Sequence, residues 1–306
     1  MMPPLAARPR RARGFPWTTR AIAAHQWISI AYGAGVFVAV SFDGRVATSP
    51  DGVTWTMRTM PATNQWTAVT YGNGLFVAVA RSGTQRVATS PDGIVWTGRT
   101  AAEARRWDSV TFGNGLFVAM SSADTDVDSS KAMTSFDGIT WTVRSITAGG
   151  GAPLNLRSVC FGNGIFVGVS SGVDTQTPGD NRVVTSTNGT TWTLRILPQF
   201  SQWWSIAFGA GLFVAVSRDG ANRVMTSPDG VTWTLRAAPA LEYFGVGVGN
   251  GLFVAVANAS SAATSPDGII WTQRTIGTGF WRGIAYGAGV FAALDFNTSG
   301  VGATAP

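Results

Sequence analysis

One sequence pattern recurs along this chain, and that repetition limits the folds that the chain can adopt. The clearest copy occupies residues 66–99, and its first glycine and last tryptophan each recur seven times at spacings of 38 to 51 residues. The glycines are Gly33, Gly72, Gly113, Gly162, Gly209, Gly249 and Gly287, and the tryptophans are Trp17, Trp55, Trp96, Trp141, Trp192, Trp233 and Trp271. A period of this length with several short β-rich runs per copy is typical of a propeller blade.

Each copy predicts four short strands joined by tight turns. Residues 75–80 are apolar at both alternating sets of positions, so we expect both faces of this strand to be covered by neighbouring blades. Asn73 and Gly74 both tolerate the positive φ of a primed hairpin turn. In the Pro-Asp-Gly triplet that follows later, proline presets φ, aspartate accepts local backbone N–H groups and glycine takes the left-handed position. The pattern therefore predicts a four-stranded antiparallel blade.

The seventh copy is divided between the two ends of the chain. Residues 281–294 supply its first two strands, and residues 302–306 match the lead-in to the Pro-Asp-Gly turn. Residues 14–20 match the outer strand of the other copies. We therefore predict an all-β fold with one domain, residues 14–306, that forms a seven-bladed β-propeller of four-stranded antiparallel blades. Residues 14–20 would complete the C-terminal blade and remove an exposed edge.

The residue types that the chain lacks exclude several kinds of chemistry. Cys160 is the only cysteine and His25 the only histidine, which rules out an intrachain disulfide, a cysteine-based zinc site and most histidine chemistry. No apolar run reaches the roughly 18 residues of a membrane-spanning helix. Asp124, Asp126 and Asp128 alternate as in a calcium loop, but the glycine and glutamate of such a loop are absent, so we prefer a solvated acidic loop. We expect no cofactor and no bound metal.

Positive charge is concentrated near the N-terminus. Of the net charge of +6, four charges come from Arg8, Arg10, Arg11 and Arg13. The remaining chain shows no basic stripe, which argues against nucleic-acid binding. We interpret residues 1–13 as a flexible basic arm, with docking to an acidic partner as the alternative. No apolar segment of a secretory signal follows the arm, and the lack of disulfides fits folding in a bacterial cytoplasm.

The Ser-Pro-Asp-Gly-x-x-Trp turn resembles the Asp-box of the sialidase-like, or BNR-repeat, propellers. The turn has one residue fewer between aspartate and tryptophan than the family box, and Phe136 replaces the proline in one copy. The resemblance implies a structural turn that is remote from the ligand site. Its acidic or amide positions are Asp51, Asp92, Asp137, Asn188, Asp229 and Asp267. Repeats of this form are also similar to those of bacteriophage tail and fibre proteins.

Strand order predicts which face of the propeller binds a ligand. The two kinds of glycine-containing turn share one end of the blades and hardly vary, whereas the loops at the other end vary, and variable loops on a rigid scaffold often carry binding. The longest insertions on this variable face fall in the third and fourth copies, at residues 121–131, 145–155 and 170–181. Six aromatic residues at the starts of the inner strands predict a sugar-stacking surface with polar neighbours; packing between blades is the competing interpretation. The candidate ligand-binding residues are Trp27, Trp66, Arg106, Trp107, Asp108, Arg157, Trp203, Glu242, Tyr243, Trp281 and Arg282.

Three functions fit these features. We favour a non-catalytic propeller that binds a host cell-surface glycan or protein receptor as part of a bacteriophage virion, in a tail or fibre, where the basic arm would dock to other virion proteins. Such a protein would act outside the cell and needs no secretory signal, because assembly and lysis release it. The second function is a sialidase-like glycoside hydrolase, for which Glu242 and Tyr243 are the one conceivable pair, although neighbours on a strand point to opposite faces. The third is a protein-interaction scaffold.

Overall fold

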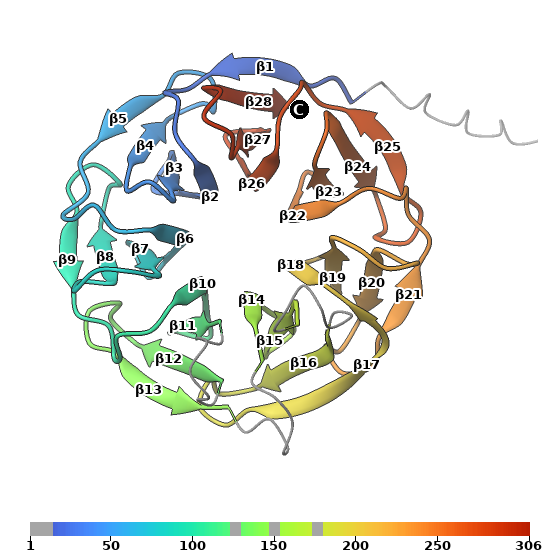
Figure 1. Ribbon diagram of the computed structural model, residues 1–306, viewed down its shortest axis with the longest axis horizontal. Coiled ribbons are helices and arrows are strands. Elements are labelled where there is room, and N and C mark those ends of the chain that lie inside the picture. The colour runs from blue at the N-terminus through green and yellow to red at the C-terminus, as the bar shows by residue number, and fades with distance from the viewer. Residues whose placement is uncertain (1–14, 123–129, 147–153, 173–179) are drawn as a thin grey trace, which may run out of the picture.

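Seven four-stranded antiparallel sheets surround a central axis (Figure 1). The computed structural model describes residues 15–122, 130–146, 154–172 and 180–306, and these residues contain no helix. The predicted all-β, seven-bladed fold is therefore confirmed. The basic arm at residues 1–13 and the acidic loop at Asp124, Asp126 and Asp128 lie outside the described residues.

Each blade places its strands in order from the axis outward. The innermost strands are β2 (Trp27–Gly33), β6 (Trp66–Gly72), β10 (Trp107–Gly113), β14 (Leu156–Gly162), β18 (Trp203–Gly209), β22 (Tyr243–Gly249) and β26 (Trp281–Gly287). The second strands are β3 (Val36–Ser41), β7 (Leu75–Ala80), β11 (Leu116–Ser121), β15 (Ile165–Ser170), β19 (Leu212–Ser217), β23 (Leu252–Ala257) and β27 (Val290–Asp295).

The third and outermost strands vary in length from blade to blade, whereas the inner two strands do not. The third strands are β4 (Val46–Ser49), β8 (Val87–Ser90), β12 (Lys131–Ser135), β16 (Asp180–Ser186), β20 (Val224–Ser227), β24 (Ser261–Ser265) and β28 (Val301–Ala305). The outermost strands are β5 (Thr56–Arg58), β9 (Thr97–Arg99), β13 (Thr142–Ser145), β17 (Thr193–Ser201), β21 (Thr234–Arg236), β25 (Thr272–Thr275) and, in the seventh blade, β1 (Thr18–Ala21). We number the blades 1 to 7 from the one that contains β2.

The N-terminal strand closes the ring, as the sequence predicts. β1 pairs antiparallel with β28, so that Thr18 lies opposite Thr304 and Thr19 opposite Ala303. The Nε of Arg20 donates to the Oγ1 of Thr304 at 2.9 Å. The same arginine-to-threonine bond joins the third and outermost strands of the other blades, from Arg58, Arg99, Arg144, Arg195, Arg236 and Arg274 to Thr48, Thr89, Thr134, Thr185, Thr226 and Thr264. The divided blade is therefore built like the continuous ones.

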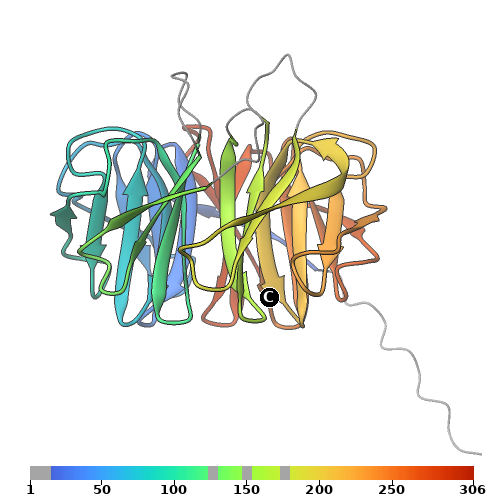
Figure 2. The same cartoon turned by 90° about the horizontal axis from the view of Figure 1, so that it is seen from below.

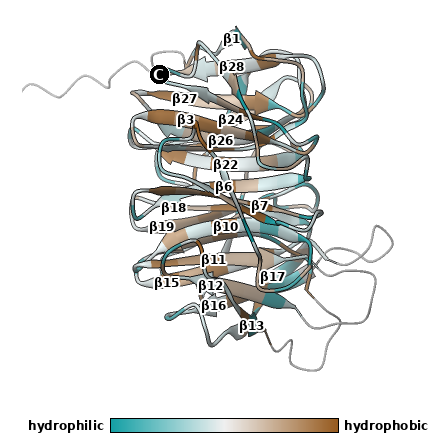
Figure 3. Ribbon diagram, turned by 90° about the vertical axis from the view of Figure 1, so that its left-hand side faces the viewer, coloured by the Kyte–Doolittle hydropathy of each residue, from teal (hydrophilic) through white to brown (hydrophobic). Residues whose placement is uncertain are grey.

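The hydrophobic core lies between the blades rather than in one central mass. Val38 and Val40 of β3 pack with Trp66 and Phe76 of the next blade, and a comparable cluster fills each of the other six interfaces. The second strands are accordingly apolar on both faces, which is visible as brown ribbons within the blades (Figure 3). Because both sides of each sheet are covered, the blades form a rigid ring with turns at its two faces (Figure 2).

The glycine-containing turns have the predicted geometry. Asn73 and Gly74 have φ values of 49° and 74°, as a primed hairpin turn requires. In the later turn, Oδ1 of Asp137 accepts the backbone N–H groups of Ile139 and Thr140, each at 2.8 Å. Asn188 makes the equivalent contacts through its amide oxygen. These contacts tie the turn to itself, at the end of the blade away from the variable face.

Acid should weaken this turn. The Thr140 and Ile139 N–H groups hold the pKa of Asp137 at about 2, below its ordinary 3.8, and the same kind of contact lowers the pKa of Asp51, Asp92, Asp229 and Asp267. The ionised aspartates therefore stabilise the folded state fully when the pH is above their unfolded-state pKa. This contribution is lost as the pH falls through their folded-state pKa. Replacing all five aspartates by asparagine should leave folding intact at pH 7, as Asn188 indicates, and should shrink the fall in Tm between pH 5 and pH 2. Thermal unfolding followed by circular dichroism measures this, and an unchanged acid sensitivity would contradict it.

Candidate functional site

Every innermost strand carries a β-bulge at its second residue. In blade 1, Trp27 pairs with Ser41 and Ser29 pairs with Val40, so Ile28 has no partner of its own. The same shift occurs in the other six blades. The seven bulge residues are Ile28, Thr67, Asp108, Arg157, Trp204, Phe244 and Arg282. A bulge re-aims a side chain relative to the regular pleat, and we call this set the bulge ring.

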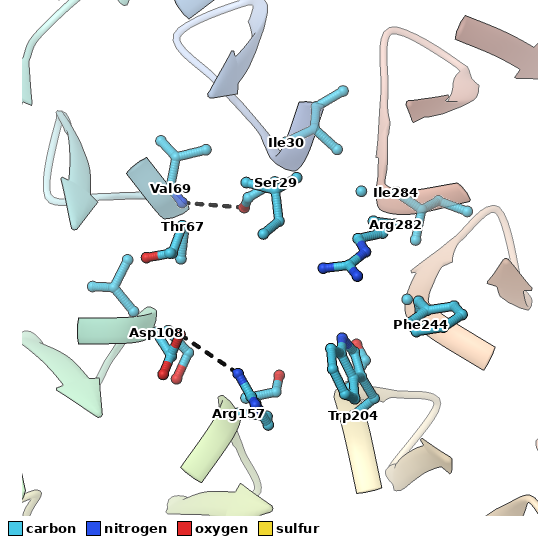
Figure 4. A pocket seen from close by; sticks show the side chains of 18 of the residues that line it. Ser29, Ile30, Thr67, Val69, Asp108, Arg157, Trp204, Phe244, Arg282 and Ile284 are labelled. Atoms are coloured by element: carbon cyan, nitrogen blue, oxygen red, sulfur yellow. Dashed lines mark hydrogen bonds and ion pairs between the residues drawn. The ribbon is translucent and has the colours of Figure 1, made fainter. Parts of the chain in front are cut away.

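The bulge ring lines a central cavity on the variable face. The cavity has a volume of about 180 Å³, and all seven bulge residues line it together with Arg81 and the residues just below them on the inner strands. Figure 4 shows Asp108, Arg157, Trp204, Phe244 and Arg282 converging on one opening from five different blades. The lining contains three arginines and one aspartate, so it carries an excess of positive charge.

The aromatic residues that precede the bulges do not reach this cavity. Trp27, Trp66, Trp107, Trp203, Tyr243 and Trp281 are all fully buried. The Nε1 of Trp27 donates to the carbonyl of Ala23 at 2.8 Å, and Trp66, Trp107 and Trp281 make the equivalent bond four residues upstream. These side chains pack between blades, which was the competing interpretation, and they present no face on which a sugar could stack.

The polar candidates divide into two groups. Asp108, Arg157 and Arg282 are bulge residues and come together in the cavity. Arg106 and Glu242 are exposed and do not line it. Oε2 of Glu242 lies 3.8 Å from Nε of Arg218.

Asp108 holds two arginines on one side of the cavity. Its Oδ1 accepts a short hydrogen bond from the Nε of Arg81 and lies 3.9 Å from an Nη1 of Arg157. Arg157 also donates from its Nε to the Oγ of Ser171 at 3.1 Å. Burial lowers the pKa of Arg157, and the Asp108 carboxylate opposes that shift. Oδ2 of Asp108 and Oγ of the neighbouring Ser109 are buried and have no hydrogen-bond partner among the described residues.

Arg282 occupies the opposite side and lies among aromatic rings. Its guanidinium carbon is 5.5 Å from the ring centre of Trp204 and 5.3 Å from that of Phe244. Phe280 and Phe296 lie closer, at 4.6 and 4.1 Å. Burial lowers the pKa of Arg282 to about 10, and repulsion from Arg157, Arg81 and Arg218 adds to the shift. Its Nε is buried and has no hydrogen-bond partner in the described part of the chain.

Sequence reasoning missed several residues of this site, although one signal points to them. Ile28, Thr67, Trp204, Phe244 and Arg81 line the cavity and were not among the candidates. Along the inner strands, the other positions hold small, apolar or aromatic residues, whereas the bulge position holds isoleucine, threonine, aspartate, arginine, tryptophan, phenylalanine and arginine. Charged residues occur on these strands only at the bulge position, which indicates that this position does not face the core.

The described part of the cavity lining does not present the paired carboxyl groups of most glycosidases. Glycoside hydrolysis ordinarily needs two carboxyl groups that flank the scissile bond, and Asp108 is the one carboxylate that the described lining residues contribute. Tyr243 is buried, donates its hydroxyl to the carbonyl of Pro239 at 2.9 Å, and has a pKa that is raised by burial. Tyr243 therefore cannot act with the exposed Glu242.

The single cysteine and the single histidine of the sequence lie away from the cavity. Cys160 lies on β14, and burial raises the pKa of its thiol. Nδ1 of His25 lies 2.7 Å from Oδ2 of Asp43. Among the described residues there is no group of three histidine, cysteine or acidic side chains that could hold a metal ion. The same part of the chain contains no helix that could cross a membrane.

Comparison with known proteins supports the fold. The chain is similar to YCF48 from Cyanidioschyzon merolae, with a TM-score of 0.68 and 15% identity over 94% of this chain and 98% of the other. It is equally similar to a structure of YCF48 bound to D1 peptide (TM-score 0.68, 14% identity, 95% and 96% coverage). A computationally designed protein, Ika8, gives a TM-score of 0.60 at 14% identity over 94% and 98% of the chains. No family model and no curated sequence matches the chain.

Proposed function

We propose that this protein is a non-catalytic binding propeller whose ligand site is the cavity inside the bulge ring. The observation that carries the proposal is that sequence variation on a rigid repeating scaffold is concentrated at side chains that converge on one cavity. A concave site of this kind, with aromatic walls and a few charged groups, is the usual form of a ligand pocket. The single carboxylate of the described lining and the buried Tyr243 favour binding over hydrolysis.

The setting that we propose is a bacteriophage virion, in which the propeller binds a glycan on the host cell surface. Support comes from the resemblance of the repeats to those of tail and fibre proteins. The virion assignment would place the protein outside the cell, with residues 1–13 available to dock to other virion proteins. A peptide ligand on the same face is the second candidate, because the similar propeller YCF48 is known in a structure with D1 peptide.

Labelling of bacterial cells tests this proposal. The fluorescently labelled full chain should bind the surface of susceptible bacteria, and Trp204→Ala should abolish that binding because Trp204 is a bulge residue in the cavity wall. Val95→Ser is the matched control, because Val95 is 68% exposed at the opposite end of its blade. Surface glycan recovered after incubation should have an unchanged mass. Binding that survives Trp204→Ala, or glycan that is shortened, would contradict the proposal.

A further inference from the structure

The cavity offers two kinds of partner to a ligand. Arg157 and Arg282 provide cationic donors near Trp204, with guanidinium carbons 4.9 and 5.5 Å from its ring centre. Beside Arg157, Oδ2 of Asp108 and Oγ of Ser109 are buried oxygens that have no hydrogen-bond partner among the described residues. A ligand that satisfies both kinds of partner needs an anionic group and, a short distance away, groups that can donate hydrogen bonds.

Arg282 is the strongest indication of an anionic group. Burying a guanidinium costs free energy unless a counter-charge or hydrogen bonds compensate for it. Arg282 contacts aromatic rings, three other arginines oppose its charge, and its buried Nε has no partner among the described residues. A carboxylate would supply the missing acceptor, since arginine and carboxylate form charge-assisted, often bidentate hydrogen bonds.

The layer below the bulge ring is rich in hydroxyl groups. The Oγ atoms of Ser29, Ser158 and Ser205 each accept a backbone N–H from the next blade, at 3.1 to 3.3 Å. A serine hydroxyl that accepts one bond still has its own hydrogen to donate. Together with Asp108 and Ser109, this layer matches a ring that carries several hydroxyls better than it matches an apolar peptide side chain.

The size of the cavity limits the ligand further. At about 180 Å³ it is smaller than the roughly 300–1,000 Å³ of pockets for drug-sized ligands. Its interior therefore matches one terminal monosaccharide, and any further sugar units would extend outward from the cavity. N-acetylneuraminic acid, with its glycerol and acetamido arms, needs more room than a six-carbon sugar acid.

We propose that the bulge ring binds a terminal hexuronic acid, with its carboxylate between Arg157 and Arg282 and its hydroxyls toward Asp108 and the serine layer. This inference rests on the proposed function and narrows it to one class of ligand. The carboxylate distinguishes the ligand from a neutral hexose of the same shape. Arg282 then acts as the residue that selects acid over neutral sugar.

Titration of the full chain with simple glycosides tests the inference. Methyl glucuronide and methyl galacturonide are compared with methyl glucoside and methyl galactoside, by calorimetry and by the fluorescence of the tryptophans. At least one uronide should bind about tenfold or more tightly than its neutral counterpart. Methyl N-acetylneuraminide should bind more weakly than that uronide.

Variants assign the preference to Arg282. Arg282→Gln should remove the preference for acid, and Arg157→Gln should reduce it. Arg274→Gln is the matched control, since this arginine bonds Thr264 at the outer edge of blade 6. Thermal unfolding establishes that each variant is folded. A preference that survives Arg282→Gln would overturn the inference.

The same experiments separate this inference from the proposed function. Suppose that Trp204→Ala abolishes cell labelling but neither uronide is preferred over its neutral counterpart. The cavity is then still supported as the ligand site, and the assignment of a hexuronic acid as its ligand is wrong. If methyl N-acetylneuraminide, or a short peptide with a free C-terminal carboxylate, binds more tightly than the uronides, the hexuronic acid assignment is also overturned and the proposed function is not. If Trp204→Ala leaves labelling intact, the proposed function fails as well.

Discussion

Deletion of residues 1–21 should lower the free energy of unfolding by at least about 5 kcal/mol, which is on the scale of the whole stability of a typical domain. The deletion removes the ladder between β1 and β28 and the bond from Arg20 to Thr304, and backbone hydrogen bonds contribute roughly 1 kcal/mol each. It also removes Trp17, a half-buried side chain that packs against the cluster containing Trp281 and Ala303. Loss of a fully buried tryptophan costs about 3–5 kcal/mol, and this one should contribute part of that. Denaturant unfolding measures the change, and aggregation through the exposed edge of β28 should accompany it.

A shorter deletion provides the control for this result. Removing residues 1–13 takes away the basic arm and leaves Trp17 and β1 in place, so it should leave the unfolding midpoint nearly unchanged. A disulfide between Thr19→Cys and Ala303→Cys, which lie opposite each other in the ladder, should form on oxidation and add up to about 5 kcal/mol. Equal stability of the two deletions would show that β1 does not close the ring.

Asp108→Asn should have opposite effects on stability and on anion binding. The carboxylate is 4% exposed and neutralises Arg81, and Arg157 lies nearby. Removing one partner of a buried ion pair costs about 3–5 kcal/mol, and we expect about 2 kcal/mol here because both arginines are partly exposed to water. The preference for uronide over neutral glycoside should rise about fivefold, since the described cavity lining loses its one carboxylate.

Ser109→Ala is the control for the charge effect. Ser109 adjoins Asp108, and its buried hydroxyl has no hydrogen-bond partner within the described ranges of the chain, so the substitution changes the cavity lining without changing its charge. It should leave the uronide preference within about twofold of the original. A fall in that preference in Asp108→Asn would contradict the assignment of Asp108 as the counter-ion of the arginines.

The repeating pattern was sufficient to predict the fold because local and long-range signals agree. The period of the Gly-x-Gly and tryptophan positions determined the number of blades, and the apolar character of residues 75–80 indicated a sheet covered on both faces. The match of residues 14–20 to an outer strand predicted the closure, although the strand itself begins at Thr18 and extends to Ala21. Such agreement between levels is what makes a sequence specify one structure.

The candidate site was located less well, for a reason that the structure makes clear. Regular alternation along a strand assigns successive side chains to opposite faces, and one extra residue reverses that assignment. The bulge supplies this extra residue in every blade, so Trp27 and its equivalents turn into the blade interfaces while Ile28 and its equivalents turn to the cavity. Arg81 follows a second strand, and its contact with Asp108 depends on the positions of two neighbouring blades.

A crystal structure of the protein grown with the preferred methyl uronide tests the central claim most directly. The ligand should lie inside the bulge ring, with its carboxylate within hydrogen-bonding distance of Arg157 and Arg282. A ligand bound instead at the face that carries the Asp137 turn, or with its carboxylate turned away from both arginines, would contradict the account.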